Sequence, residues 1–388
     1  MLPAARSRAE KVPDWLAALG IFVAARLVTS ITLAVGFALM TPTGFADPSA
    51  PRGFFERSTG WDGQYFLGIA ERGYPSTLPT NEDGDVLRNT WAFLPVFPIL
   101  IKLLTFVGGD PAVVAVLLAT VFGAGASVAL MTLLRPHVGR TTALWSTTFF
   151  AFGPMAFVLQ LAYAESLGLL LGFAALIAMQ RQRYWVILPI VVVLAFTRPG
   201  AVAIPLALAV HGIIRLVRRD PVPMRERIAI VVTGLVTAAA GLAWPVVASI
   251  ATGVPDAYLQ TELAWWRLHF DVEHFMPLAP WFLQADRLGG VLGVVALSVA
   301  VAIAGVWLAS RSVRRIGSVP LLGTASYLLY LFATFLPQQS LFRLLMPAAP
   351  LLGVPALHRS QARRWFVLAC CVVSQVLAVW VLFLKLNP

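Results

Sequence analysis

The chain has 388 residues, of which 59% are hydrophobic and only 12% are charged. Soluble domains carry about 25% charged residues, so this composition excludes an ordinary soluble protein. Apolar runs that reach or approach the ~20 residues of a membrane-spanning helix recur along the chain. They predict an all-α polytopic membrane protein.

The net charge of +11 comes from basic residues that gather in short links between the apolar runs. These links are residues 135–140, 181–183, 215–227, 311–315 and 359–364. Such a distribution is typical of the cytoplasmic loops of membrane proteins, where anionic headgroups contribute to it. We therefore expect membrane lipids, and no nucleic acid, as partners of this charge.

In chain order, the first apolar run is longer than the ~7–15 residues of a signal-peptide core and predicts an uncleaved signal anchor. Residues 41–90 and 252–287 are the two extended polar regions, which we expect to form external loops. The expected spans are residues 15–40, 111–134, 141–159, 165–180, 184–197, 200–216, 228–251, 289–310, 319–336, 341–357 and 365–386.

Residues 93–107 are apolar, but they are few for a span and include Pro95, Pro98 and Lys102. If they crossed fully, the basic links at 135–140 and 181–183 could not both share the cytoplasmic side with the N-terminus. If residues 93–107 form a re-entrant or incomplete span instead, both basic links lie on the cytoplasmic side with the N-terminus. The prediction is one domain, residues 1–388, with about 11 transmembrane helices, a cytoplasmic N-terminus and an external C-terminus.

Asp62 stands between Trp61 and Gly63 in the first loop, just outside an apolar span. The residues that follow it mix apolar and polar types as in a short amphipathic helix on the membrane surface. A carboxylate at the start of that helix suits a cap. It also suits a general base that takes a proton from a hydroxyl at the bilayer surface. The residues alone leave both interpretations open.

Three more charged residues lie at the edges of apolar runs, where charge is costly and usually marks a site or an ion pair. Glu165 begins one run, Arg198 lies in the turn before Pro199, and Arg343 lies just inside the start of another. Guanidinium groups bind phosphate well. The alternatives are a helix N-terminal role for Glu165 and snorkelling of Arg198 to lipid headgroups.

The second loop contributes Trp265 and His269. Tryptophan rings stack on sugars, but they also form belts at membrane interfaces. His269 and His274 are poorly spaced for a shared metal and no His-Glu-x-x-His motif occurs, so we expect neither a metal nor a cofactor. The predicted topology brings this loop to the same external face as Asp62, Tyr163, Glu165, Arg198 and Arg343, which indicates a single site.

Five short motifs follow one another along most of the chain. They are Trp61-Asp62-Gly63-Gln64-Tyr65-Phe66, Phe93-Leu94-Pro95-Val96-Phe97-Pro98, Tyr163-Ala164-Glu165-Ser166-Leu167, Thr197-Arg198-Pro199-Gly200, and Arg343 with Met346-Pro347 and Pro350. Their order and spacing resemble those of PIG-V-type mannosyltransferases, members of the GT-C superfamily of membrane glycosyltransferases. The turn at Arg198 is one residue shorter than in that family.

The resemblance implies a GT-C-like bundle. We expect it in a bacterial plasma membrane, with the active site on the external face to which the predicted topology brings Asp62. The resemblance also implies inverting transfer of mannose from a polyprenyl-phosphate sugar to a hydroxyl of a lipid-linked or glycan acceptor. Asp62 would be the general base, and Arg198 and Arg343 would bind the donor phosphate. The acceptor and sugar would contact Gln64, Tyr65, Tyr163, Glu165, Trp265 and His269. A partner subunit is left open, and a transporter or lipid flippase is the alternative.

Overall fold

The computed structural model describes residues 12–40, 52–267, 270 and 274–385. Its regular structure is helical apart from an isolated β-bridge between Thr80 and Val86. The α-helices are α1 (Asp14–Leu39), α2 (Phe54–Arg57), α3 (Asp62–Arg72), α4 (Val96–Phe106), α5 (Pro111–Ala151), α6 (Glu165–Gln180), α7 (Tyr184–Ala195), α8 (Ala203–Val217), α9 (Met224–Gly241), α10 (Ala243–Thr252), α11 (Ala257–Trp266), α12 (Ala279–Leu308), α13 (Ser318–Thr334), α14 (Leu341–Leu344) and α15 (Gln361–Ala378).

Six helical segments among the described residues are long and apolar enough to cross a membrane. They are Asp14–Leu39, Pro111–Ala151, Pro199–Val217, Met224–Thr252, Ala279–Leu308 and Gln361–Lys385. Helices α4, α6, α7 and α13 are shorter and also apolar. The prediction of an all-α membrane protein is confirmed, whereas the count of about eleven crossings is not. Helix α4, with 11 residues, is about 16 Å long and covers only about half of the hydrocarbon core.

Helix α5 is two segments that double back at Gly139, whose φ of 77° and ψ of 165° are not helical. A Cβ built on Gly123, before this turn, would lie 3.0 Å from the Phe22 ring in α1. Ala151, after the turn, accepts a hydrogen bond from Arg26, one helical turn further along α1. Both segments therefore run beside α1, as expected for separate spans at 111–134 and 141–159, although the second helical segment ends at Ala151.

The expected span at residues 341–357 is not a continuous α-helix. It forms α14 and two 3₁₀ segments, η6 (Met346–Gly353) and η7 (Pro355–Leu357). The prediction was wrong because Pro347, Pro350 and Pro355 lack the backbone N–H groups that an α-helix needs.

The amphipathic helix expected in the first loop is α3, but its apolar face packs on protein. Phe66 contacts the rings of Phe93 and Phe97, with centroids 5.3 Å away in each case. Glu71 and Arg72, at the end of the helix, are exposed and pair with each other. Helix α3 is thus fixed against α4 and the segment that precedes it.

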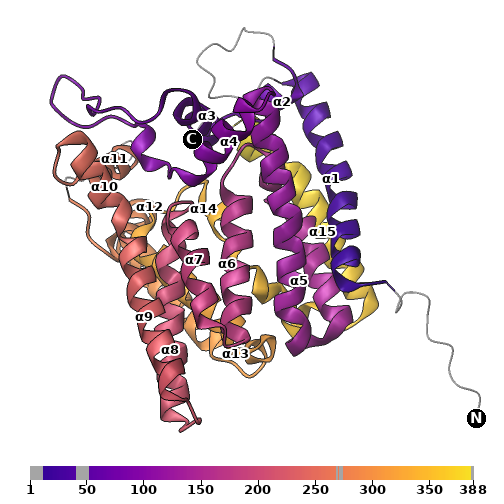
Figure 1. The fold of residues 1–388 in the computed structure, drawn as a ribbon. Coiled ribbons are helices and arrows are strands. Elements are labelled where there is room, and N and C mark those ends of the chain that lie inside the picture. The colour runs from indigo at the N-terminus through magenta and orange to yellow at the C-terminus, as the bar shows by residue number, and fades with distance from the viewer. Residues whose placement is uncertain (1–11, 41–51, 268–269, 271–273, 386–388) are drawn as a thin grey trace, which may run out of the picture.

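The short helices gather at one end of the bundle (Figure 1). Helices α2, α3, α4 and α11 lie there, above α6 and α7. The N-terminus of α1 is at the other end, where Asp14 pairs with Arg135 and Arg140. The chain returns to the first end in Val379–Lys385, since Leu384 packs on Gly36 near the end of α1.

Arg26 ties α1 to the break that follows α5. It is buried and donates hydrogen bonds to the carbonyl oxygens of Ala156 at 2.6 Å and of Ala151 at 2.8 Å. These carbonyls belong to the chain that leads into α6. One buried side chain therefore helps to hold the start of α6 in place.

We expect Arg26→Met to lower the free energy of unfolding by about 3 kcal/mol, because two buried carbonyl groups lose a charged donor. The melting temperature of the detergent-solubilised protein measures this effect. Arg72→Met is the matched control, because Arg72 is exposed and its ion pair contributes little. Equal melting temperatures for the two variants would contradict the structural role of Arg26.

Candidate active site

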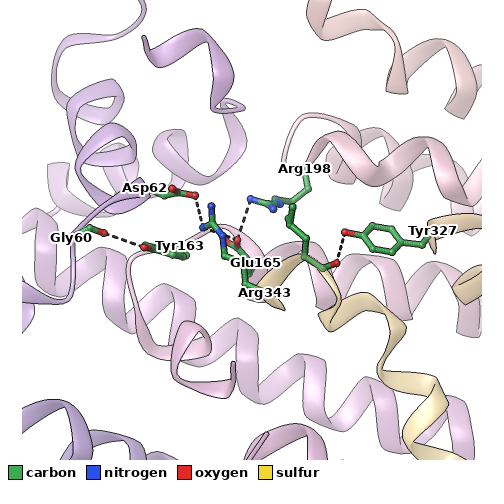
Figure 2. Close-up of polar contacts among 8 residues, drawn as sticks. Gly60, Asp62, Tyr163, Glu165, Arg198, Tyr327 and Arg343 are labelled. Atoms are coloured by element: carbon green, nitrogen blue, oxygen red, sulfur yellow. Dashed lines mark hydrogen bonds and ion pairs between the residues drawn. The ribbon is translucent and has the colours of Figure 1, made fainter. Parts of the chain in front are cut away.

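Four charged side chains from distant parts of the sequence meet at the end of the bundle where α3 lies (Figure 2). Arg343 Nη1 is 2.5 Å from Asp62 Oδ2 and 3.1 Å from Glu165 Oε1. Arg198 Nη1 is 3.3 Å from the same Glu165 oxygen. The Glu165 side chain is only 5% exposed. Two carboxylates and two guanidinium groups thus form a neutral cluster in which Glu165 is shared.

Asp62 is the first residue of α3, but it does not cap the helix. The N-cap position is Trp61, and no side chain makes a capping hydrogen bond there. The interpretation of Asp62 as a helix cap is therefore wrong, because its carboxylate pairs with Arg343 instead. Trp61 has φ 63° and ψ −119°, a conformation that costs a bulky residue about 1–3 kcal/mol. This strained residue sets the direction in which Asp62 enters the cluster.

Close packing of two backbones also fixes the start of α3. A Cβ built on Gly63 would lie 3.3 Å from the Cβ of Ala162, and the Ala162 N–H donates to the Ser58 carbonyl at 3.1 Å. The glycine therefore lets the first loop approach the segment that leads to Glu165. This contact brings the two carboxylates toward one another.

Arg343 is supported on two sides. Its guanidinium carbon lies 5.2 Å from the centre of the buried Tyr163 ring, a cation–π contact. The Tyr163 hydroxyl donates to the Gly60 carbonyl at 3.3 Å, and the Tyr327 hydroxyl donates to the carbonyl of Leu344, next to Arg343, at 2.8 Å. Figure 2 shows both contacts flanking the cluster. Arg343 is thus held by α13 and by the segment before α6, which is itself tied to the first loop.

Arg198 reaches the cluster across a glycine. It is the N-cap residue of η4 (Pro199–Val202), and its side chain passes over Gly168 in α6. A Cβ on Gly168 would lie 2.8 Å from Arg198 Cγ, too close without displacement. The expected alternative, snorkelling to headgroups, does not describe this side chain, because it is 22% exposed and pairs with Glu165.

The cluster lines one end of a cavity of about 1260 Å³ that extends between α6, α8, α9 and α13. The far end is lined by Arg215, Asp220 and Arg227, about 18 Å along α8. Most of the lining between the ends is apolar or glycine, for example Gly172, Leu176, Ala209, Gly212, Gly234 and Leu235. The cavity therefore has charged residues at both ends and a long apolar stretch between them; we call the end that holds the cluster its mouth.

Of the other residues expected to contact the sugar or the acceptor, some line the cavity and some do not. Trp265 lines the cavity, and its indole ring is 5.1 Å from the Arg88 guanidinium carbon. Tyr65 stacks on Phe93 with ring centroids 4.5 Å apart and does not line the cavity. Gln64 does not line it either, and His269 lies outside the described residues.

Sequence reasoning missed Glu262, which lines the cavity together with Tyr258, one turn earlier on α11. Burial raises the pKa of the Glu262 carboxyl to about 7, against the opposing effects of the Tyr258 hydroxyl and of Arg198. The signal available in the sequence was the spacing of Tyr258 and Glu262, four residues apart on one face of a helix in the second loop.

Among the described residues, no three His, Cys, Asp or Glu side chains are grouped so that they could hold a metal ion. The fold and the site instead define a polytopic membrane protein whose charged site opens into an apolar cavity. The sequence matches the family described as Mannosyltransferase (PIG-V) over residues 23–215, about half of the chain. The chain belongs to this family of glycosyltransferases. The matched segment contains Asp62, Glu165 and Arg198, and Arg343 lies beyond it.

Among solved structures, the chain is similar to the Archaeoglobus fulgidus oligosaccharyltransferase in complex with Zn and sulfate. The TM-score is 0.47 and the sequence identity is 13%. The alignment covers 91% of this chain and 53% of that protein, so the chain spans about half the length of this structural relative. A search of curated proteins found no match.

We expect Gly168→Ala to reduce the turnover number at least tenfold, because the added methyl group displaces the Arg198 side chain. Initial rates and the melting temperature are measured together. Gly20→Ala is the control, since a Cβ at Gly20 in α1 has no neighbour within 4 Å. Full activity of Gly168→Ala at an unchanged melting temperature would show that the position of Arg198 does not matter.

Proposed function

We propose that the protein is a GT-C-type enzyme that transfers mannose, with inversion, from a polyprenyl-phosphate sugar to a hydroxyl of a lipid-linked or other glycan acceptor. One observation carries this proposal. Asp62, Glu165, Arg198 and Arg343 meet at the mouth of a long apolar cavity in a member of the PIG-V mannosyltransferase family.

The donor fits the two parts of the cavity. A polyprenyl chain is apolar and long, and a cavity of about 1260 Å³ is larger than the ~300–1,000 Å³ of ordinary ligand pockets. The phosphate would lie at the mouth, where Arg198 and Arg343 supply guanidinium groups that bind phosphate oxygens in pairs. The sugar would then project from the phosphate toward Asp62.

Asp62 would act as the general base. Its ion pair with Arg343 uses Oδ2, and we assign Oδ1 to the acceptor hydroxyl. The acceptor oxygen bonds to the anomeric carbon while its proton passes to Asp62. The bond between that carbon and the phosphate oxygen breaks on the opposite side, and its electron pair leaves with the phosphate. The departing lipid phosphate therefore gains negative charge beside Arg198 and Arg343.

Glu165 lies between the two arginines and would have two roles. It holds both guanidinium groups in place through Oε1. Both of its carboxylate oxygens are buried, and Oε2 accepts no hydrogen bond from any described residue. A carboxylate in this state can stabilise the positive charge that develops on the sugar ring as the donor bond breaks.

The alternative of a transporter or flippase has less support. A transport site is expected near the middle of the bilayer, whereas this cluster lies at one end of the bundle. Membership of a glycosyltransferase family also favours an enzyme. The plasma membrane of a bacterium and an external active site are part of the proposal, as the positive-inside distribution of basic residues favours this orientation.

We expect Asp62→Asn to lower the turnover number by about 10²–10⁴-fold, because the amide cannot accept the hydroxyl proton. Purified protein is incubated with radiolabelled polyprenyl-phosphate mannose and a membrane lipid extract, and the labelled product is quantified. Glu71→Gln serves as the control, since Glu71 lies on the same helix but is exposed. Turnover near the normal value in Asp62→Asn would remove Asp62 from the role of base.

Labelling of introduced thiols tests the orientation, with Cys370 and Cys371 first replaced by serine. We expect a membrane-impermeant maleimide to label Glu71→Cys in intact cells, because Glu71 is exposed at the end of the bundle that holds the site. Arg225→Cys, exposed at the start of α9 at the opposite end, should react only after permeabilisation. The reverse pattern would place the active site on the cytoplasmic face.

A further inference from the structure

Helix α11 lines the cavity with one side that carries polar, aromatic and apolar residues. Tyr258, Glu262 and Trp265 all line the cavity, and their spacing of four and three residues places them on one side of the helix. The neighbouring Thr261 is buried and accepts a hydrogen bond from Asn89 at 3.0 Å, which ties α11 to the first loop. The face of α11 toward the cavity is therefore held in a fixed position.

Glu262 differs from the other carboxylates of the cavity. Four acidic residues line it among the described residues, namely Asp62, Glu165, Asp220 and Glu262. The first three have arginine partners within 4 Å, whereas Glu262 forms no ion pair with any residue that the structure describes. Besides the effect of burial, the charge of Arg198 lowers the pKa of its carboxyl and the charge of Asp62 raises it, so both groups lie near Glu262. Glu262 therefore lines the cavity close to the proposed phosphate site and the proposed base.

That space is where the transferred sugar must lie, if the proposed function holds. Inversion requires the acceptor oxygen, the anomeric carbon and the departing oxygen to be in line. The sugar ring is then placed between Asp62 and the phosphate on Arg198, with Glu165 on one side. Glu262, Tyr258 and Trp265 line the same mouth from α11.

We propose that Glu262, with Tyr258 and Trp265, forms the subsite that binds the ring hydroxyls of the transferred sugar and determines which sugar is accepted. The Glu262 carboxyl lies beside the Tyr258 hydroxyl and has acceptor capacity left for sugar hydroxyls, and aromatic rings pack on the C–H face of a sugar. With a pKa of about 7, Glu262 can both donate and accept hydrogen bonds near neutral pH. This subsite rests on the proposed function of the cluster.

Binding of two lipids separates this role from a merely structural one. The affinities of purified protein for polyprenyl-phosphate mannose and for sugar-free polyprenyl phosphate are compared for the unaltered chain, Glu262→Ala and Glu262→Gln. We expect Glu262→Ala to weaken binding of the mannose lipid about 10- to 100-fold and to leave binding of the sugar-free lipid unchanged. Glu262→Gln, which keeps hydrogen-bonding groups, should lose less. Gln260→Ala, on the same helix but not lining the cavity, should bind both lipids normally.

A second comparison uses the polyprenyl-phosphate sugar that is the C2 epimer of mannose. Glu262→Ala should reduce the preference for mannose over this epimer about tenfold. Equal losses for the mannose lipid and the sugar-free lipid, or an unchanged preference between epimers, would overturn the role of Glu262. If the unaltered chain prefers the mannose lipid through Glu262 but transfers no mannose, the proposed function fails while the subsite stands. If it transfers mannose but Glu262→Ala binds normally, only the subsite fails.

Discussion

The arrangement of this protein depends on one buried carboxylate that two arginines share. Glu165, 5% exposed, receives Arg198 from the end of α7 and Arg343 from α14, and Arg343 extends the cluster to Asp62. A buried ion is costly unless it is paired, so each of these segments is constrained by the charge of the others. The start of α6 is therefore the point at which the first loop, the turn after α7 and the segment before η6 are brought together.

Small residues and one strained residue allow these segments to pack closely around Glu165. Gly63 lets α3 approach Ala162, and Gly168 leaves room for the Arg198 side chain. Trp61 adopts a positive φ at the same place. Backbone strain of this kind persists only where the surrounding contacts outweigh it, which is a common property of functional sites. The contacts that outweigh it here include the ion pair of the adjacent Asp62 with Arg343.

The sequence was sufficient to predict most helices and the charged residues of the site, but not which of these charges pair. Apolar runs fix where helices form, and charges at the edges of these runs drew attention to Asp62, Glu165, Arg198 and Arg343. The prediction of a continuous helix at residues 341–357 failed, because proline there outweighs the apolar composition. The predicted number of membrane crossings was not confirmed either. The pairing of Asp62 with Arg343 joins residues 281 positions apart, which no local pattern encodes. Glu262 escaped notice because its spacing from Tyr258 is a weak signal until the position of α11 over the cavity is known.

The charge balance of the cluster has a consequence for the proposed reaction. Without a ligand, each guanidinium group has a carboxylate partner, so the site is neutral in apolar surroundings. A lipid phosphodiester brings one negative charge, and the phosphate that departs carries nearly two. The attraction between the arginines and the phosphate therefore grows as the bond to the sugar breaks. An interaction that is stronger with the departing phosphate than with the donor lowers the barrier instead of merely tightening donor binding.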